Sequence, residues 1–290
     1  MKIGRPTPVP VGPPDASCRH ANVVVPSRMD RTESDANAPS RRPAAGFHVV
    51  RTRPEHAAQV ASVIRAAHRV SEHDPCFSCF REEHVRRQIR RFPEGQFVAV
   101  EAGPEGRDRV VGCAVLMRTD VPPERGHGSW LRTIGSLGLH RHEPNGRWLY
   151  GVEMAVHPDA QGRGVGSALY RHRLRLVGEL GLEGLYAGGL LKGYRRYRRR
   201  LSPRAYADRV RGGQIEDPTV SMQLRKGFRA EGVLEHYDDD VDSGDCAVLI
   251  VWRAGAKRPD RLPAPVVAKR AWPRVRPDRG RPEGRPDRRR

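Results

Sequence analysis

The fold is decided by one stretch, which reads YGVEMAV at residues 150–156, HPDA at 157–160 and QGRGVGS at 161–167. The first segment is largely apolar and predicts a strand that ends at His157, because Pro158 cannot donate a ladder hydrogen bond. Apolar residues then recur at helical spacing as far as Leu180. The stretch therefore predicts a strand, a turn and a helix.

Three glycines, at positions 162, 164 and 166, lie where the turn enters the helix. Small residues let the backbone approach a ligand, and the free N–H groups of the first helical turn favour an anion. A Rossmann fingerprint starting at Gly162 would need glycine at Ser167, and the Gly-Lys-Ser/Thr of a Walker A loop is absent. The pattern Q-x-x-G-x-G remains, either as a phosphate-binding turn or as a plain glycine-rich turn.

Composition divides the 290 residues into three parts. Residues 1–45 show no sustained apolar period, and residues 256–290 are mostly Arg, Pro, Gly and Asp. Neither end carries enough apolar surface to offset its ordering entropy, so we expect a disordered N-terminal extension and a disordered basic tail. The middle, residues 46–255, is long enough for one α/β domain.

The net charge of +19 is uneven: the tail after Gly255 holds thirteen Lys and Arg against four Asp and Glu. Such a tail is able to contact polyanions nonspecifically, although Arg-rich extensions also follow from a GC-rich coding sequence. Five cysteines, an odd number, fit a reducing compartment rather than a disulfide framework. With no apolar run of membrane-span length and no signal-peptide core, we expect a cytoplasmic protein without membrane contact.

The spacing of apolar residues and the positions of turn residues predict the remaining helices and strands. We expect strands at 47–51, 96–101, 109–118, 147–157, 185–189, 228–234 and 247–252, and helices at 54–70, 82–91, 203–210 and from 217 to Gly227. Residues 121–145 and 190–216 are irregular insertions, the second containing the helix that Ser202-Pro203 opens. The predicted fold is α/β, with a mixed parallel and antiparallel sheet and a β-α-β crossover at its centre.

This order of elements, with Q-x-x-G-x-G after the central strand and KGF at 226–228, resembles the GNAT superfamily of acyl-CoA-dependent N-acyltransferases. The resemblance covers residues 46–255 and implies the GNAT fold, with splayed central parallel strands. A closer similarity is to the GNAT domain that often precedes a carbon-nitrogen hydrolase domain. The motifs that carry it are FPEGQ at 92–96, LYG at 149–151, AGG at 187–189, GY at 193–194, SP at 202–203 with Tyr206, and DP at 217–218.

The resemblance implies acetyl-CoA as the co-substrate. Backbone N–H groups of the turn would hold its pyrophosphate, and the end of the central strand would pair with the pantetheine arm, one strand N–H stabilising the oxyanion. The residues so implied are Ala155, Val156, Gln161, Gly162, Arg163, Gly164, Val165, Gly166 and Ser167.

Acyl transfer to an amine also needs a base, since an amine with a pKa of about 10 is almost wholly protonated at neutral pH. Glu153 is the candidate: a carboxylate within an apolar strand costs energy unless it is paired or functional, and family members often have an acid three residues before Val156. The alternative is a structural carboxylate, satisfied by Arg147 or by loop amides.

The proton donor for the leaving thiolate is less clear. Where the family often has tyrosine, this chain has Gln223, which has no acidic proton. Tyr186, Tyr194 and Tyr237 are the possible substitutes, although each also suits a half-buried core position. The residues at 238–240, all Asp, either attract a cationic amine or form a solvated turn, and His157 suits a strand end.

A cluster of His73, Cys76 and Cys79, with His84 beyond it, has a single Cys-x-x-Cys and no second pair. We therefore expect no metal, and instead a partly buried loop over the acceptor groove. The overall prediction is an N-acetyltransferase that moves an acetyl group from acetyl-CoA to a small-molecule or peptide amine in a ternary complex. The alternative is a catalytically silent CoA-binding module, which Gln223 makes worth testing.

Overall fold

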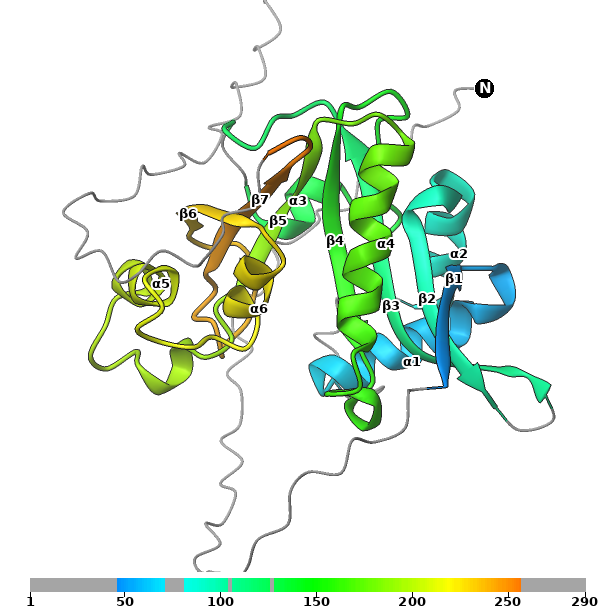
Figure 1. The fold of residues 1–290 in the computed structure, drawn as a ribbon, viewed down its shortest axis with the longest axis horizontal. Coiled ribbons are helices and arrows are strands. Elements are labelled where there is room, and N and C mark those ends of the chain that lie inside the picture. Colours follow the sequence, from blue (N-terminus) through cyan, green and yellow to red (C-terminus); the bar gives the residue numbers. More distant parts are fainter. Residues whose placement is uncertain (1–45, 71–80, 104–105, 126–127, 257–290) are drawn as a thin grey trace, which may run out of the picture.

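The computed structural model describes residues 46–70, 81–103, 106–125 and 128–256. The expected extension at 1–45, the tail from 257 onward and the cluster of His73, Cys76 and Cys79 lie outside the described residues. Within them one sheet of seven strands runs through the molecule (Figure 1), in the order β1-β2-β3-β4-β5-β7-β6. The strands are β1 (Phe47–Arg51), β2 (Gln96–Ala102), β3 (Asp108–Thr119), β4 (Trp148–Val156), β5 (Gly184–Leu190), β6 (Arg229–Leu234) and β7 (Ala247–Arg253).

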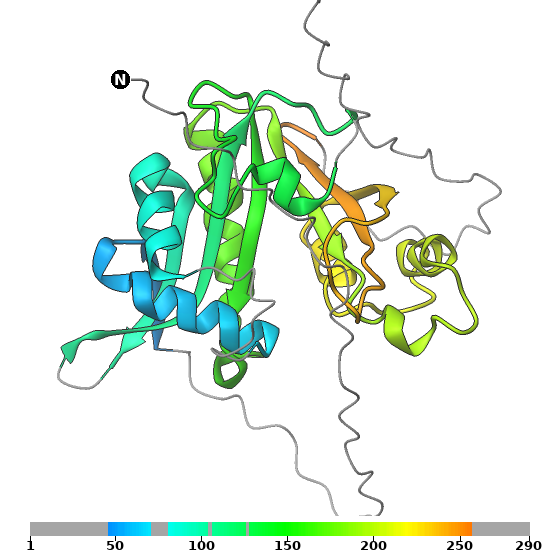
Figure 2. The same cartoon turned by 180° about the vertical axis from the view of Figure 1, so that it is seen from behind.

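Helices cover both faces of this sheet. The long helix α4 (Val165–Glu179) lies across β3 and β4 on the face seen in Figure 1, with α6 (Val220–Arg225) beside it over β5 and β7. The opposite face, seen in Figure 2, carries α1 (Ala57–His68), α2 (Glu82–Arg91) and the short α3 (Trp130–Ile134). Each face buries its own apolar cluster, since side chains of successive strand residues point to opposite sides.

The two central strands part after three residue pairs. β4 and β5 run parallel and pair only from Trp148 with Gly184 to Tyr150 with Tyr186, whereas β3 follows β4 along its whole length. A register shift in the β3–β4 ladder leaves Val152 as an extra residue at the point where β4 turns away from β5. The expected mixed sheet with splayed central parallel strands is therefore confirmed.

Local sequence signals set the remaining helices. The helix expected from Ser202-Pro203 is α5 (Pro203–Arg211), and the Ser202 hydroxyl accepts the Ala205 N–H at 3.2 Å, as an N-cap does. The helix expected from 217 is shorter, because Asp217 does not enter it. Its carboxylate accepts the N–H groups of Thr219 and Val220, each at 2.9 Å, and α6 starts at Val220. Gly227, at φ 93°, ends it as expected.

Sequence reasoning missed α3, which lies inside the insertion expected to be irregular. Ser129 caps its start by accepting the Arg132 N–H at 3.4 Å, and Gly135, at φ 77°, ends it. Five residues are too few for a helical period to show among the surrounding prolines and glycines. The helix nevertheless matters to the site, since the Trp130 indole N–H donates to the Val152 carbonyl at the bulge, at 2.9 Å.

Candidate active site

The turn before α4 presents its backbone to solvent. Gly162 and Gly164 have φ angles of 73° and 88°, and a Cβ at either position would meet no atom within 4 Å. Gly164 is the N-cap of α4. The N–H groups in the first turn of this helix therefore have no carbonyl partner within the helix. A Cβ at Gly166 would lie 3.9 Å from Met154 and Val156. The open backbone fits a phosphate group, as the sequence predicts.

Side chains around this turn brace it rather than fill it. The Gln161 amide donates to the Val156 carbonyl at 3.3 Å, and Arg163 forms an ion pair with Glu101 at 2.7 Å. Val165 is buried, so that it can offer a ligand only its backbone. The Ser167 hydroxyl accepts from Lys226, the residue that follows α6, at 2.7 Å, which brings a cation to the start of α4.

The open edge of β4 continues from this turn. The His157 N–H donates to the Val111 carbonyl of β3 at 3.0 Å, so by the two-residue period Ala155 also faces β3, whereas Met154 and Val156 face the gap toward β5. In agreement, the Met154 N–H donates to the Glu153 carboxylate at 2.8 Å instead of to β3. The pantetheine contact of Ala155 and Val156 stays a prediction, and Met154 joins Val156 at the open edge.

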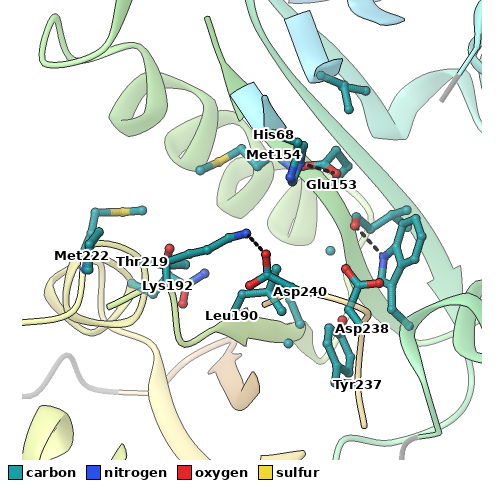
Figure 3. Close-up of a pocket in the computed structure, with 18 of the residues that line it drawn as sticks. His68, Glu153, Met154, Leu190, Lys192, Thr219, Met222, Tyr237, Asp238 and Asp240 are labelled. Atoms are coloured by element: carbon teal, nitrogen blue, oxygen red, sulfur yellow. Dashed lines mark hydrogen bonds and ion pairs between the residues drawn. The ribbon is translucent and has the colours of Figure 1, made fainter. Parts of the chain in front are cut away.

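A cavity of about 450 Å³ lies where β4 and β5 part. Gly151 to Met154 of β4 and Ala187, Gly188 and Leu190 of β5 form its walls, α4 and α6 contribute to one side, and α1 and residues 237–241 contribute to the other. Figure 3 shows side chains from both sides directed into it, with Glu153 and His68 opposite Lys192 and Asp240.

Glu153 projects into this cavity and forms an ion pair with His68, the last residue of α1. Their Oε2 and Nε2 atoms lie 3.2 Å apart, and the side chains are 15% and 31% exposed (Figure 3). The expected alternative partner, Arg147, instead pairs with Asp120 and Glu183, each at 2.7 Å. The sequence singled out Glu153 but did not predict His68, although His68 lies four residues after the buried Ile64, which also lines the cavity.

The ion pair between Glu153 and His68 shifts the pKa of both residues. Burial by itself would raise the pKa of Glu153, but the charge and hydrogen bond of His68, with the Met154 N–H and Lys192, outweigh burial and hold that pKa below its usual value. The Glu153 charge and hydrogen bond raise the pKa of His68 above 6.5, although burial and Lys192 oppose them. The carboxylate is therefore ionised at neutral pH, and His68 is the more basic member of the pair.

The three tyrosines named from the sequence do not come together. The Tyr186 hydroxyl donates to the Val121 carbonyl at 2.8 Å and the Tyr194 hydroxyl to the Leu201 carbonyl at 2.9 Å, and neither residue lines the cavity. Tyr237 does line it, but its hydroxyl shares a hydrogen bond of 2.6 Å with Tyr150. Burial raises the pKa of Tyr186 and of Tyr237 well above 10. Their role as the acid stays untested.

Acidic residues 238–240 also line the cavity. Asp240 forms an ion pair with Lys192, whereas burial, then the charges of Asp240 and Glu153, raise the pKa of Asp238. In the described part of the chain no group of three His, Cys, Asp or Glu residues is arranged to hold a metal ion. Cys113 and Cys246 are both buried free thiols.

None of the described helices combines the length and apolarity needed to cross a membrane.

An open glycine turn between a central strand and a helix, beside a cavity between two parting strands, is the arrangement that the resemblance to acyl-CoA-dependent acyltransferases leads us to expect. Residues 59–196 match the model of the family described as Acetyltransferase (GNAT) family. The match covers just under half of the chain and supports the resemblance to the GNAT acetyltransferase family, which indicates an acyl-CoA N-acyltransferase.

Two relatives are from Bacillus subtilis (strain 168). The chain is 29% identical over 179 residues, 61% of its length, to a protein named probable hydrolase YhcX, of which it covers 34%. It is 28% identical over 172 residues, 59% of its length, to uncharacterized N-acetyltransferase YkwB, of which it covers 74%. The chain thus spans about a third of the first relative, which agrees with the expected similarity to a GNAT domain joined to a hydrolase.

Two solved structures share the fold. The GphF GNAT-like decarboxylase in complex with isobutyryl-CoA has a TM-score of 0.58 and 21% identity, over 71% of this chain and 98% of that one. The loading GNATL domain of CurA from Lyngbya majuscula has a TM-score of 0.59 and 18% identity, over 71% and 97%. At this identity the likeness confirms the fold alone.

Proposed function

We propose that this protein transfers an acetyl group from acetyl-CoA to an amine by direct attack within a ternary complex. The observation that carries the proposal is the Glu153–His68 pair, which faces the cavity between the parting strands at one end of the open backbone edge that starts at the phosphate turn. Glu153, which supports the proton acceptor His68, and the proposed phosphate turn lie along one strand and the turn that follows it, and these meet the two main needs of amine acylation.

Each part of the site would have one task. The backbone from Gln161 to Ser167 holds the pyrophosphate. The edge of β4 at Met154 and Val156 aligns the arm, and the Val156 N–H is offered to the oxyanion, since the Met154 N–H donates to Glu153. One such donor contributes about 3 kcal/mol in enzymes where it has been removed. Acetyl-CoA supplies the activated acyl group, and the protein supplies binding, alignment and proton transfer.

The amine proton would leave through the pair. An amine that arrives as a cation must lose a proton before its lone pair can attack, and neutral His68, hydrogen-bonded to ionised Glu153, is placed to accept it. The acidic residues 238–240 would favour a cationic acceptor at the cavity entrance. We propose a small-molecule or peptide amine in this role.

The test is thiol release from acetyl-CoA with a panel of simple primary amines, polyamines and peptides with a free α-amino group. At least one acceptor should release CoA at a rate that depends on its concentration. Acetyl-CoA that binds in calorimetry but is never consumed with any acceptor would support the alternative, a silent CoA-binding module. The absence of acetyl-CoA binding would overturn both.

A further inference from the structure

Direct acyl transfer leaves a thiolate, and the cavity must compensate its negative charge. A free thiol has a pKa of about 8.5, and expelling its anion into a largely buried site is costly without a proton or a nearby cation. Gln223 lines the cavity and has no acidic proton, and the hydroxyls of Tyr186 and Tyr194 donate to carbonyls elsewhere. Tyr237 lines the cavity, but its hydroxyl is engaged with Tyr150 at 2.6 Å, which leaves the tyrosine of α4 as the other phenol in the described lining.

Tyr170 of α4 meets this need. Its side chain is nearly inaccessible, with the residue 2% exposed, yet it lines the cavity beside Gln223. The Gln223 amide donates to the Tyr170 oxygen at 3.1 Å, so that Gln223 leaves the phenolic proton unused. No described residue accepts that proton, which is free to pass to a ligand atom in the cavity.

Arg173 places a cation against this phenol. It is 3% exposed, and its guanidinium carbon lies 4.9 Å from the centre of the Tyr170 ring. Within the part of the chain that the structure describes, no carboxylate lies within 4.0 Å of it, and its buried Nε has no partner. A buried cation without a counter-ion is costly, and a phenolate on Tyr170 would supply the missing anion.

The fold holds this cation where the strands part. A Cβ on Gly151 would lie 2.1 Å from the Arg173 Nη2, so only glycine lets the guanidinium pack against β4 at this position. Tyr170 lies six residues, roughly 9 Å at 1.5 Å per residue, along α4 from the phosphate turn at Gly164. The phenol is therefore on the α4 side of the cavity, and the Glu153–His68 pair is on the α1 side.

We propose that Tyr170 is the catalytic acid that protonates the leaving thiolate, with Arg173 and Gln223 stabilising the phenolate that remains. This inference rests on the proposed acyltransferase function. His68 first releases to water the proton it took from the ammonium group. The neutral amine nitrogen then forms a bond to the carbonyl carbon, and the proton that this nitrogen must still lose passes to His68. The C–S bond then breaks, its electron pair stays on sulfur, and sulfur takes the Tyr170 proton. Water returns the proton from His68 to the phenolate, so the overall reaction yields amide and free CoA.

The first test removes single hydroxyl groups. Tyr170→Phe should lower kcat by about 10²-fold, the usual contribution of a general acid, and leave the calorimetric affinity for acetyl-CoA within about twofold. Tyr197→Phe, which removes a phenol outside the cavity, is the matched control and should keep kcat. Tyr186→Phe tests the rival named from the sequence. Full activity in folded Tyr170→Phe, or a comparable loss in Tyr186→Phe alone, would overturn the proposal.

The second test asks whether Arg173 acts through Tyr170. Arg173→Met should lower kcat by about tenfold in the parent but hardly at all in Tyr170→Phe, because coupled residues do not contribute additively. Arg173→Lys, which keeps the charge, should recover part of the loss. Equal losses in both backgrounds would show that Arg173 serves the fold and not the acid. Parent protein that releases no thiol with any amine would overturn the proposed function, and this inference with it.

Discussion

Replacing Glu153 by Gln is the sharpest test of the base, because it removes one charge and keeps the size of the side chain. At about 4 Å and an effective dielectric constant of 20, two unit charges interact by about 4 kcal/mol, and the exposure of His68 reduces that figure. A tenfold change in rate corresponds to about 1.4 kcal/mol, so losing half to two-thirds of this interaction predicts a decrease in kcat of about 10²-fold at neutral pH.

The Glu153→Gln variant should also differ from the parent in the pH dependence of its rate. His68 accepts a proton only when neutral, so the parent rate should rise as pH climbs through its raised pKa. The Glu153 charge is the largest cause of that shift, with Asp238 adding to it and burial and Lys192 opposing it. In Glu153→Gln the rising limb should therefore move to lower pH. The deficit in rate should also shrink toward the pKa of the amine, where solution supplies the free base.

Steady-state thiol release over a range of pH, with calorimetry for acetyl-CoA affinity, measures both effects. Affinity should hardly change, because the proposed cofactor contacts are mainly with the backbone. Glu231→Gln is the control, since Glu231 forms an ion pair with Arg253 at 3.0 Å away from the cavity. A folded Glu153→Gln variant with the parent's kcat and pH profile would refute the reasoning and make Glu153 a structural carboxylate.

Three other changes test the turn, the insertion and the tail. Gly164→Asp and Gly166→Glu should abolish acetyl-CoA binding in calorimetry while circular dichroism stays native, because they add bulk and negative charge at an open turn. Asp217→Ala should lower the free energy of unfolding by about 3–5 kcal/mol, and the melting temperature by roughly 10 °C, because this fully buried carboxylate accepts hydrogen bonds from Gly193, Tyr206, Thr219 and Val220. A melting temperature unchanged from the parent would contradict that account. Deleting residues 257–290 should leave turnover intact, since the sheet is complete at Arg253, and any nonspecific binding of nucleic acid by the tail should fall steeply with added salt.

Local signals were enough to predict most of the fold. The second helix has the predicted bounds of 82 and 91, and the central strand, turn and long helix differ from prediction by one or two residues at their ends. Proline and glycine act on their own part of the backbone, so their effect is visible in a short window of sequence. The same reasoning predicted the glycine turn at the start of α4, and the phosphate site proposed there consists of backbone at one helix start.

The contacts that determine the chemistry were not visible in this way. Glu153 and His68 are 85 positions apart, and Gln223 and Tyr170 are 53 apart. Such pairs depend on which helix covers which strand, and that is a property of the assembled sheet. One signal was available for Arg173: it stands three residues before the buried Leu176 and four after the buried Leu169, within the apolar stripe of its helix. A cation in such a stripe is the same kind of signal as the Glu153 carboxylate in its apolar strand, and it favours a site as a hypothesis.

The positions of these two charges argue for a division of labour across the cavity. A base that takes a proton from an amine must stay more basic than its surroundings, and the Glu153 carboxylate does this for His68. An acid that gives a proton to sulfur must have its conjugate base stabilised, and Arg173 would do this for Tyr170. Exchanging the two charges would disable both steps, since a cation beside His68 would lower its pKa and an anion beside Tyr170 would repel the phenolate that the proposed acid leaves behind. In this proposal the parting of β4 and β5 would keep the two charges on opposite sides of the substrate, so that each would act on its own proton transfer.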